Sequence, residues 1–204
     1  MKKELMTPLT AKDIEALRIG DIVYLSGTLV TGRDDVLRRV LHEHMECPVD
    51  FSKAAIFHGG PIIRTNVDGT FECVAIGPTS SIRMENDQAD FIKVTGLKII
   101  IGKGGMGEKT AAGCKKYKCI HCVYPGGCAV KAADLVERVE GVEWPELGMP
   151  EALWIFRVRQ FGPLIVSIDT QGNNLFTENL ARYQSQKEKC EAPIIASVKE
   201  YQKI

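Results

Sequence analysis

Short apolar runs alternate with amphipathic stretches along this chain, and this alternation limits the folds that it can adopt. The apolar runs predict strands at 21–30 ("DIVYLSGTLV"), 54–57, 71–76 and 97–101. The stretch "RDDVLRRVLHEHME" (33–46) predicts a helix with one apolar stripe, made of Val36, Leu37, Val40, Leu41 and Met45. Strands that alternate with helices predict an α/β domain.

The same pattern continues toward both ends of the chain. Thr10 is followed three residues later by Asp13, which is a helix-start signal. Further elements are expected as a helix at 126–140, a pair of strands at 152–160 and 164–170, and a helix with a charged exposed face at 178–190. No internal repeat or low-complexity linker interrupts the sequence, so a single domain over residues 1–204 is expected.

Composition narrows the class of protein. The chain has 204 residues, and its 26 Lys and Arg balance 26 Asp and Glu, so no net field favours nucleic acid or an anionic membrane as a partner. No apolar run is long enough to span a bilayer, and "MKKELMTPLT" lacks the apolar stretch of a signal peptide. Seven unevenly spread cysteines suit reduced thiols better than a disulfide scaffold, so a cytoplasmic location is expected.

Four of the cysteines lie in "CKKYKCIHCVYPGGC" (114–128), at positions Cys114, Cys119, Cys122 and Cys128. The C-x4-C-x2-C spacing is the first part of a plant-type iron–sulfur pattern. However, "KCIHCVY" predicts a strand after a helix at about 107–117, and side chains along a strand alternate between faces. Cys119 and Cys122 would then point to opposite sides of the sheet. We therefore expect no metal ligation by these cysteines, and expect His121 to be packed or exposed rather than a ligand.

The stretch "KIIIGKGGMGEKT" (98–110) combines an apolar strand, a glycine-rich turn and a helix, the context in which backbone N–H groups bind phosphates. The pattern G-x-x-x-x-G-K-[ST] nearly fits from Gly102 to Thr110, but Glu108 intrudes between Gly107 and Lys109. Nucleotide binding is therefore disfavoured. An anion-binding turn that presents Lys103 is expected instead, and the alternative is a tight turn with a solvated lysine.

A third stretch, "AIGPTSSIRMEN" (75–86), follows a predicted strand with Pro78, a run of hydroxyls and Arg83. If a helix begins near Thr79 or Ser80, Thr79 lies at its electropositive N-terminus and Arg83, four residues on, projects near the same face. Taken alone, this pattern favours simple helix capping.

Five motifs occur in a fixed order: "SGTLVTGRD", "FHGGPIIR", "GPTSSIRME", "IGKGGMG" and "ELGMPEALWIFRV". Together they resemble the β subunit, or equivalently the C-terminal domain, of the iron–sulfur class I fumarate hydratases and the related L(+)-tartrate dehydratases. The resemblance runs from about residue 5 to 185. It is specific for the family and much less so for the substrate.

The resemblance implies a swivelling β/β/α fold, with mixed sheets and flanking helices. It also implies a [4Fe–4S] cluster held by a separate α subunit, with one iron free to act as a Lewis acid on the departing hydroxyl. This chain would contribute substrate-binding side chains across the interface of a hetero-oligomer, for which α2β2 is expected. The cysteines at 114–128 are not part of the family pattern, which agrees with the strand argument.

Residue by residue, the family's site falls on Arg33, Thr79, Arg83 and Lys103. The family's "GPTTAGRMD" has become "GPTSSIRME", which keeps Thr79, Arg83 and their spacing. The three cations suit a small dicarboxylate, since arginine can bind a carboxylate with two parallel bonds. They also suit the extra negative charge that builds up when a proton beside a carboxylate is removed. The resemblance makes Thr79 the base for that proton. The alternative is that its hydroxyl only caps a helix or hydrogen-bonds the substrate.

The sequence leaves the substrate undecided between fumarate and tartrate. Fumarate is expected, because its hydration is the commoner metabolic role in this family. Two other classes stay open: a free-standing iron–sulfur or zinc-binding module that uses Cys114 to Cys128, and a nucleotide-binding regulator that uses the glycine turn.

Overall fold

A closed ring of five strands forms the centre of the protein, seen in a computed structural model that describes residues 3–201. The main sheet has the order β1-β2-β3-β6-β7-β9-β8, and β2 pairs with β9 as well. The strands β2, β3, β6, β7 and β9 therefore close on themselves. Their bounds are β1 Lys3–Met6, β2 Ile22–Thr31, β3 Ala55–Phe57, β6 Ile99–Gly102, β7 Ile120–Val123, β8 Val136–Glu143 and β9 Leu153–Ile168.

Strand direction decides where the loops of the ring meet. β2, β3, β6 and β7 run parallel, with Ile56 opposite Ile100 and Ile100 opposite His121. β9 runs antiparallel to both β2 and β7 and closes the ring. The carboxyl ends of the four parallel strands consequently lie at one edge.

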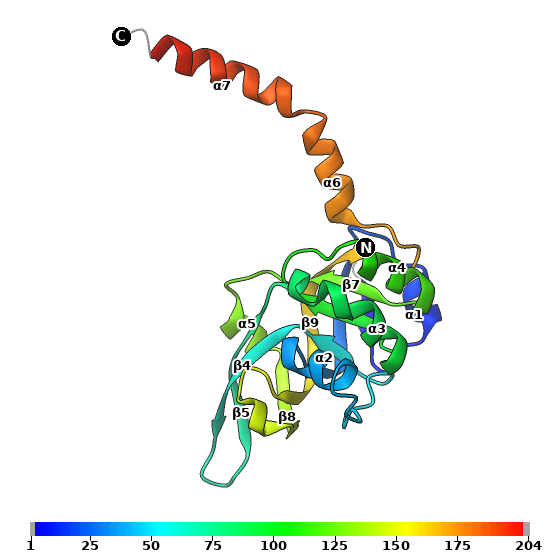
Figure 1. Ribbon diagram of the computed structural model, residues 1–204. Helices are drawn as coiled ribbons and strands as arrows, with labels where there is room; N and C mark the ends of the chain where they lie inside the picture. Colours follow the sequence, from blue (N-terminus) through cyan, green and yellow to red (C-terminus); the bar gives the residue numbers. More distant parts are fainter. Residues whose placement is uncertain (1–2, 202–204) are drawn as a thin grey trace.

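Helices cover one side of the ring, and the core divides accordingly. The cluster inside the ring includes Leu25, Phe57, Ile101, Cys122 and Phe161, all fully buried. A second cluster lies between the outer face of the sheet and the helices α2 (Asp34–Leu41), α3 (Glu85–Thr95) and α4 (Glu108–Tyr117). Figure 1 shows these three helices on the same side of the molecule.

The remaining elements are smaller or peripheral. A two-stranded sheet, β4 (Gly59–Thr65) and β5 (Phe71–Pro78), extends from the body as a hairpin (Figure 1). The short helices are α1 (Ala11–Glu15), α5 (Ala129–Ala133) and the 3-10 turns η1 (Ser81–Met84) and η2 (Pro145–Leu147). The last helices, α6 (Leu175–Gln184) and α7 (Lys187–Tyr201), project away from the body (Figure 1). No helix in the described part of the chain is long and apolar enough to cross a membrane.

The mixed α/β class with flanking helices is confirmed, as are the strands expected near 21–30, 54–57, 71–76 and 97–101. The helix start at Thr10 is also confirmed, because Asp13 accepts hydrogen bonds from the Thr10 backbone and hydroxyl. The predicted pair of late strands is one continuous strand, β9.

Two predicted helices are too long. The helix expected at 33–46 ends at Leu41, because His44 adopts a left-handed backbone conformation (φ 53°) that a helix cannot accommodate, and this leaves Met45 exposed. The helix expected at 126–140 covers only Ala129–Ala133. Its second half belongs to β8, because the β-branched Val136 and Val139 pack against the core beside the free edge of β9.

Candidate active site

The carboxyl edge of the parallel strands brings together segments that are far apart in the sequence. Gly32, directly after β2, donates its N–H to the carbonyl of Phe57 at 3.0 Å, and His58, directly after β3, donates to the carbonyl of Ile101 at 2.7 Å. Arg33 and Lys103 follow the ends of β2 and β6. In open α/β sheets ligands bind at the carboxyl ends of strands, which makes this edge the first place to look for a site.

The segment that follows β5 is laid along this edge by backbone hydrogen bonds. The N–H of Thr79 donates to the carbonyl of His58 at 2.7 Å. The N–H of Lys103 donates to the carbonyl of Thr79 at 3.0 Å, and the N–H of Ser81 donates to the carbonyl of Lys103 at 3.0 Å. Thr79 and Lys103, 24 positions apart in the sequence, are therefore fixed side by side by the main chain.

Thr79 and Arg83 are joined through their side chains. Nη1 of Arg83 donates to Oγ1 of Thr79 at 3.4 Å. The expected helix begins at Ser81, as the 3-10 turn η1, and continues directly into α3. Thr79 therefore lies just before the helix, and Ser80 is the cap residue. The Thr79 hydroxyl makes no capping bond and faces the guanidinium instead.

Arg33 lies between two carboxylates at the start of α2. Its Nε is 2.7 Å from Oε1 of Glu151 and 3.6 Å from Oδ2 of Asp34. The Nε–H points at neither oxygen, so these contacts are ion pairs without a directional hydrogen bond. Burial raises the pKa of Glu151, and the charge of Arg33 partly offsets this rise. The side chain of Arg33 is only 19% exposed, so this cation is held firmly.

The side chain of Lys103 is less constrained than the side chains of the two arginines. Its side chain is exposed, and its aliphatic stem passes close to Gly126, where an added Cβ would lie 3.1 Å from Cδ of Lys103. Among the residues that the structure describes, no carboxylate pairs with its ammonium group. The four residues predicted from the sequence thus meet at one edge, with two of the cations paired to acids of the chain and the third unpaired.

Sequence reasoning missed a buried polar support beneath this edge. Nδ1 of His58 lies 3.0 Å from Oγ of Ser81, and both side chains are fully buried. Burial lowers the pKa of His58 to about 4, so the ring is neutral near pH 7. A Cβ at Gly102 would overlap Oγ of Ser81, so only glycine fits there. The motif "FHGG" and the glycine that precedes Lys103 were the sequence signals that could have suggested this contact.

Two acidic neighbours of the arginines were also missed. Asp34 directly follows Arg33 in "SGTLVTGRD", and Glu151 lies in "ELGMPEALWIFRV". Both stretches had been singled out as motifs, but a carboxylate in a loop has no periodicity that would assign it to a particular arginine. Only the fold brings Glu151 from the segment before β9 to Arg33.

A carboxylate of the same chain, that of Glu85, occupies the glycine-rich turn before α4. The carboxylate of Glu85 accepts hydrogen bonds from the N–H groups of Gly107 at 2.7 Å, Lys109 at 3.0 Å and Thr110 at 3.2 Å. It also accepts one from the Thr110 hydroxyl at 2.7 Å. The N–H groups that a phosphate would need are therefore occupied, which argues against the nucleotide-binding alternative. The N–H groups of Gly107, Lys109 and Thr110 are therefore not available to an external anion, whereas anion binding by Lys103 stays a prediction.

The cysteines are distributed as strand alternation predicts. Cys114 and Cys119 belong to the core under the helices, whereas Cys122 lies inside the strand ring. Burial raises the pKa of the Cys122 thiol well above its ordinary value. His121 is fully buried with Nδ1 2.6 Å from Oγ of Ser167, as its packed alternative predicted. Over residues 3–201 no group of three or more His, Cys, Asp or Glu side chains is placed to hold a metal ion.

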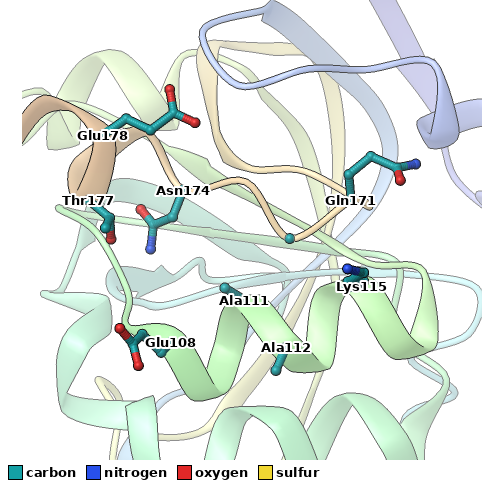
Figure 2. A pocket seen from close by; sticks show the side chains of 9 residues that line it. Glu108, Ala111, Ala112, Lys115, Gln171, Asn174, Thr177 and Glu178 are labelled. Carbon is teal, nitrogen blue, oxygen red and sulfur yellow. The ribbon is translucent and has the colours of Figure 1, made fainter.

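A separate pocket of about 300 Å³ lies beside α4 and the loop that leads into α6. Figure 2 shows its lining, with Glu108, Ala111 and Lys115 on α4 facing Gln171, Asn174 and Glu178. The pocket includes none of the four candidate residues. Those four residues lie instead at the carboxyl edge of the strand ring.

A mixed-sheet α/β domain that presents cations and a hydroxyl at one strand edge agrees with the family that the motifs suggested. The chain belongs to the Fumarase C-terminus family, which it matches over residues 1–179. Members that resemble it are subunits or domains of hydro-lyases.

Three relatives illustrate the range. The L(+)-tartrate dehydratase subunit beta of Escherichia coli (strain K12) is 50% identical over 201 residues, which is 98% of each chain. A putative L(+)-tartrate dehydratase subunit beta of Methanocaldococcus jannaschii is 42% identical over 174 residues, covering 83% of this chain and 89% of the relative. A putative fumarate hydratase class I of Geobacillus stearothermophilus is 40% identical over 171 residues, covering 84% of this chain but 33% of that longer protein.

Proposed function

We propose that this chain is the β subunit of an iron–sulfur hydro-lyase that dehydrates L(+)-tartrate to oxaloacetate. The observation that carries the proposal is that Arg33, Arg83, Lys103 and Thr79 lie at one edge of the strand ring, with Arg83 donating to the Thr79 hydroxyl. The chain supplies substrate-binding and proton-transfer residues, and the site is completed by an α subunit.

The cations account for binding of a dicarboxylate. Such a substrate carries one negative charge at each end of a four-carbon chain, and each charge needs a donor group. Arginine binds a carboxylate through a planar fork, whereas lysine offers a compact charge on a flexible stem. The unpaired, exposed Lys103 suits a carboxylate that arrives from solvent or from across an interface. The same charges stabilise the extra negative charge that develops when the carbon beside the carboxylate loses its proton.

Thr79 is proposed as the group that takes this proton. A threonine hydroxyl is a weak base, so it requires a nearby positive charge that favours its ionised form. Arg83 supplies this charge, since its Nη1 already donates to Oγ1 of Thr79. The main-chain bonds of Thr79 to His58 and Lys103 hold the hydroxyl in place, which limits the reorganisation needed at the reacting carbon.

The cofactor and partner are assigned to a separate subunit. The cysteine geometry offers this chain no site for a [4Fe–4S] cluster, which supports an α subunit as its holder. The name "subunit beta" of the relatives supports a hetero-oligomer, for which we propose α2β2. Seven free cysteines support a cytoplasmic location.

The proposed substrate is tartrate. The sequence alone had favoured fumarate instead. That expectation relied on how common fumarate hydration is, whereas the tartrate relatives match at 50% identity over 98% of both chains. Fumarate stays the second candidate, because the Geobacillus relative at 40% identity is named a putative fumarate hydratase.

Co-expression with the α subunit and anaerobic purification test the proposal. The assembled enzyme is expected to form oxaloacetate from L(+)-tartrate with a kcat/KM at least about tenfold above that for malate and fumarate. A reversed preference would establish the fumarate alternative. Absence of both activities in an enzyme that contains its full cluster would refute the hydro-lyase assignment.

A further inference from the structure

One carboxylate, that of Asp34, lies between the two site arginines. Its Oδ2 is 2.7 Å from Nη2 of Arg83 and 3.6 Å from Nε of Arg33. Asp34 is the first residue of α2, so its backbone position is set by the helix rather than by a loop. No group other than these two arginines forms an ion pair with it among the described residues.

The contacts continue on both sides of Asp34 as a chain of alternating charges. Oε1 of Glu151 lies 2.7 Å from Nε of Arg33, and at the other end Nη1 of Arg83 donates to Thr79. Arg83 therefore uses one terminal nitrogen for Asp34 and the other for Thr79. Its side chain is 49% exposed, so without an anchor the guanidinium would be free to adopt other rotamers.

We propose that Asp34 is a positioning residue for catalysis: it holds the guanidinium of Arg83 in the orientation that presents Nη1 to Thr79. The inference rests on the proposed function and deepens it. A fixed guanidinium matters most in the transition state, when charge moves from the threonine oxygen to the carboxylate of the substrate. In this role Asp34 affects the reaction through Arg83 and not by acting on the reacting carbon itself.

The matched control is the next residue, Asp35. Both aspartates lie in the first turn of α2, where an acid favours the helix. Asp35 pairs with Arg38 at 3.2 Å, away from the site arginines. Asp34→Asn and Asp35→Asn thus each remove one charge from the same helical turn, and only the first removes the ion pairs with Arg83 and Arg33.

The readout is kcat per assembled αβ unit, isolated by size exclusion and normalised to its iron content. Asp34→Asn is expected to lower this kcat by about 10- to 100-fold, the scale of a misplaced catalytic group. The Ki of succinate, an unreactive dicarboxylate, should change less than about threefold, because the arginine charges are retained. Asp35→Asn should leave both values within about twofold of wild type.

A double-mutant cycle separates positioning from a structural role. If Asp34 acts through Arg83, Asp34→Asn should reduce kcat little further in an Arg83→Ala background. Additive losses, or a reduced yield of assembled enzyme with unchanged kcat, would overturn the positioning role. If Asp34→Asn fails to assemble, Asp34→Glu serves instead, since it keeps the charge but displaces the carboxylate by one methylene, and a wild-type kcat for it would also overturn the role.

A failure of the positioning role of Asp34 can be distinguished from a failure of the proposed function. If Arg83→Ala and Thr79→Val both turn over like wild type, the site assignment itself is wrong. If those variants are impaired while Asp34→Asn is not, only the positioning role of Asp34 is rejected.

Discussion

Arg83 donates through Nη1 to the hydroxyl of Thr79 while its Nη2 lies 2.7 Å from the carboxylate of Asp34. The guanidinium of Arg83, which belongs to η1, thus links the proposed base Thr79 to Asp34 at the start of α2. This relationship ties the chemistry at Thr79 to the packing of α2 against η1.

Replacing Thr79 tests the proposed base. Thr79→Val keeps the shape of the side chain but removes its oxygen, so we expect kcat to fall by roughly 100-fold or more, the usual scale for loss of a general base. Thr79→Ser keeps a hydroxyl and should retain part of the activity. Exchange of the substrate carbon-bound proton with deuterated solvent, followed by NMR, should fall with kcat in the valine variant. Wild-type exchange in that variant would mean that another residue is the base.

Replacing Lys103 tests the unpaired cation. Lys103→Ala should reduce kcat/KM by more than tenfold, because one charge-assisted contact to a carboxylate contributes roughly 1.5–3 kcal/mol. Lys109→Ala is the control, since Lys109 lies in the first turn of α4, six residues after Lys103, and donates to Asn86 at 2.9 Å. Equal steady-state kinetics for the two variants would return Lys103 to the role of a solvated surface lysine.

Arg33 calls for a conservative substitution, because its side chain lies against Glu151 and is only 19% exposed. An exposed arginine in a turn could be truncated without structural cost, but Arg33 is mostly buried against Glu151. Arg33→Ala would leave that carboxylate without its cation, so lost activity and lost stability would be mixed. Arg33→Lys keeps the charge and is the better probe of two-point carboxylate binding.

Removing the carboxylate of Glu85 tests the internal anion of the glycine turn. Glu85→Ala leaves three backbone N–H groups and one hydroxyl without their acceptor. We expect the free energy of unfolding, measured by urea denaturation, to fall by about 2–3 kcal/mol. The control Glu108→Ala removes an exposed acid from the first turn of α4 and should cost less than about 1 kcal/mol. A small effect at Glu85 would show that water replaces the carboxylate readily.

Two buried histidines predict how stability depends on pH. Burial lowers the pKa of His58 to about 4 and that of His121 to about 3, from an ordinary 6.5. The unfolded chain therefore binds more protons than the folded one below pH 6.5, so stability is lost as pH falls from about 6.5 toward 4. Each histidine contributes up to about 1.4 kcal/mol per pH unit in this window.

The measurement is the free energy of unfolding from urea titrations at pH 7.5, 6.0 and 5.0. His121→Gln should reduce the slope of the unfolding free energy against pH by the contribution of one histidine. His44→Gln, at an exposed position, should leave that slope unchanged. Parallel slopes for both variants would show that His121 is protonated in the folded state.

The cysteine geometry predicts a chain without a cluster of its own. Anaerobic reconstitution of this subunit with iron and sulfide should yield no stoichiometric brown species, because Cys119 and Cys122 lie in separate cores. Alkylation under native conditions should label the exposed Cys190 first, and the buried Cys114 and Cys122 only on unfolding. A stable cluster that is lost in Cys119→Ala and Cys122→Ala would overturn the division of labour between the subunits.

The sequence alone determined the class of fold, most of the strands and the opposed orientation of Cys119 and Cys122. Each of these follows from a local rule: alternation along a strand, one stripe along a helix, or an ordered set of motifs. Local rules failed at 126–140, where helical spacing and β-branched valines conflict. There the free edge of β9, which is distant in sequence, decided in favour of β8.

Only the tertiary structure decided which charges meet. The motifs named Arg33, Arg83 and Lys103, but not that Asp34 joins the two arginines or that Glu151 lies against Arg33. They also did not reveal that Glu85 occupies the N–H groups at the start of α4. Ion pairs between loops leave no periodic trace in a sequence, because they depend on where the strand ring brings the chain back on itself. Hydrophobic periodicity therefore determined the helices and strands, and the motifs determined the family. The closing of the strand ring decided which charged side chains meet at the site.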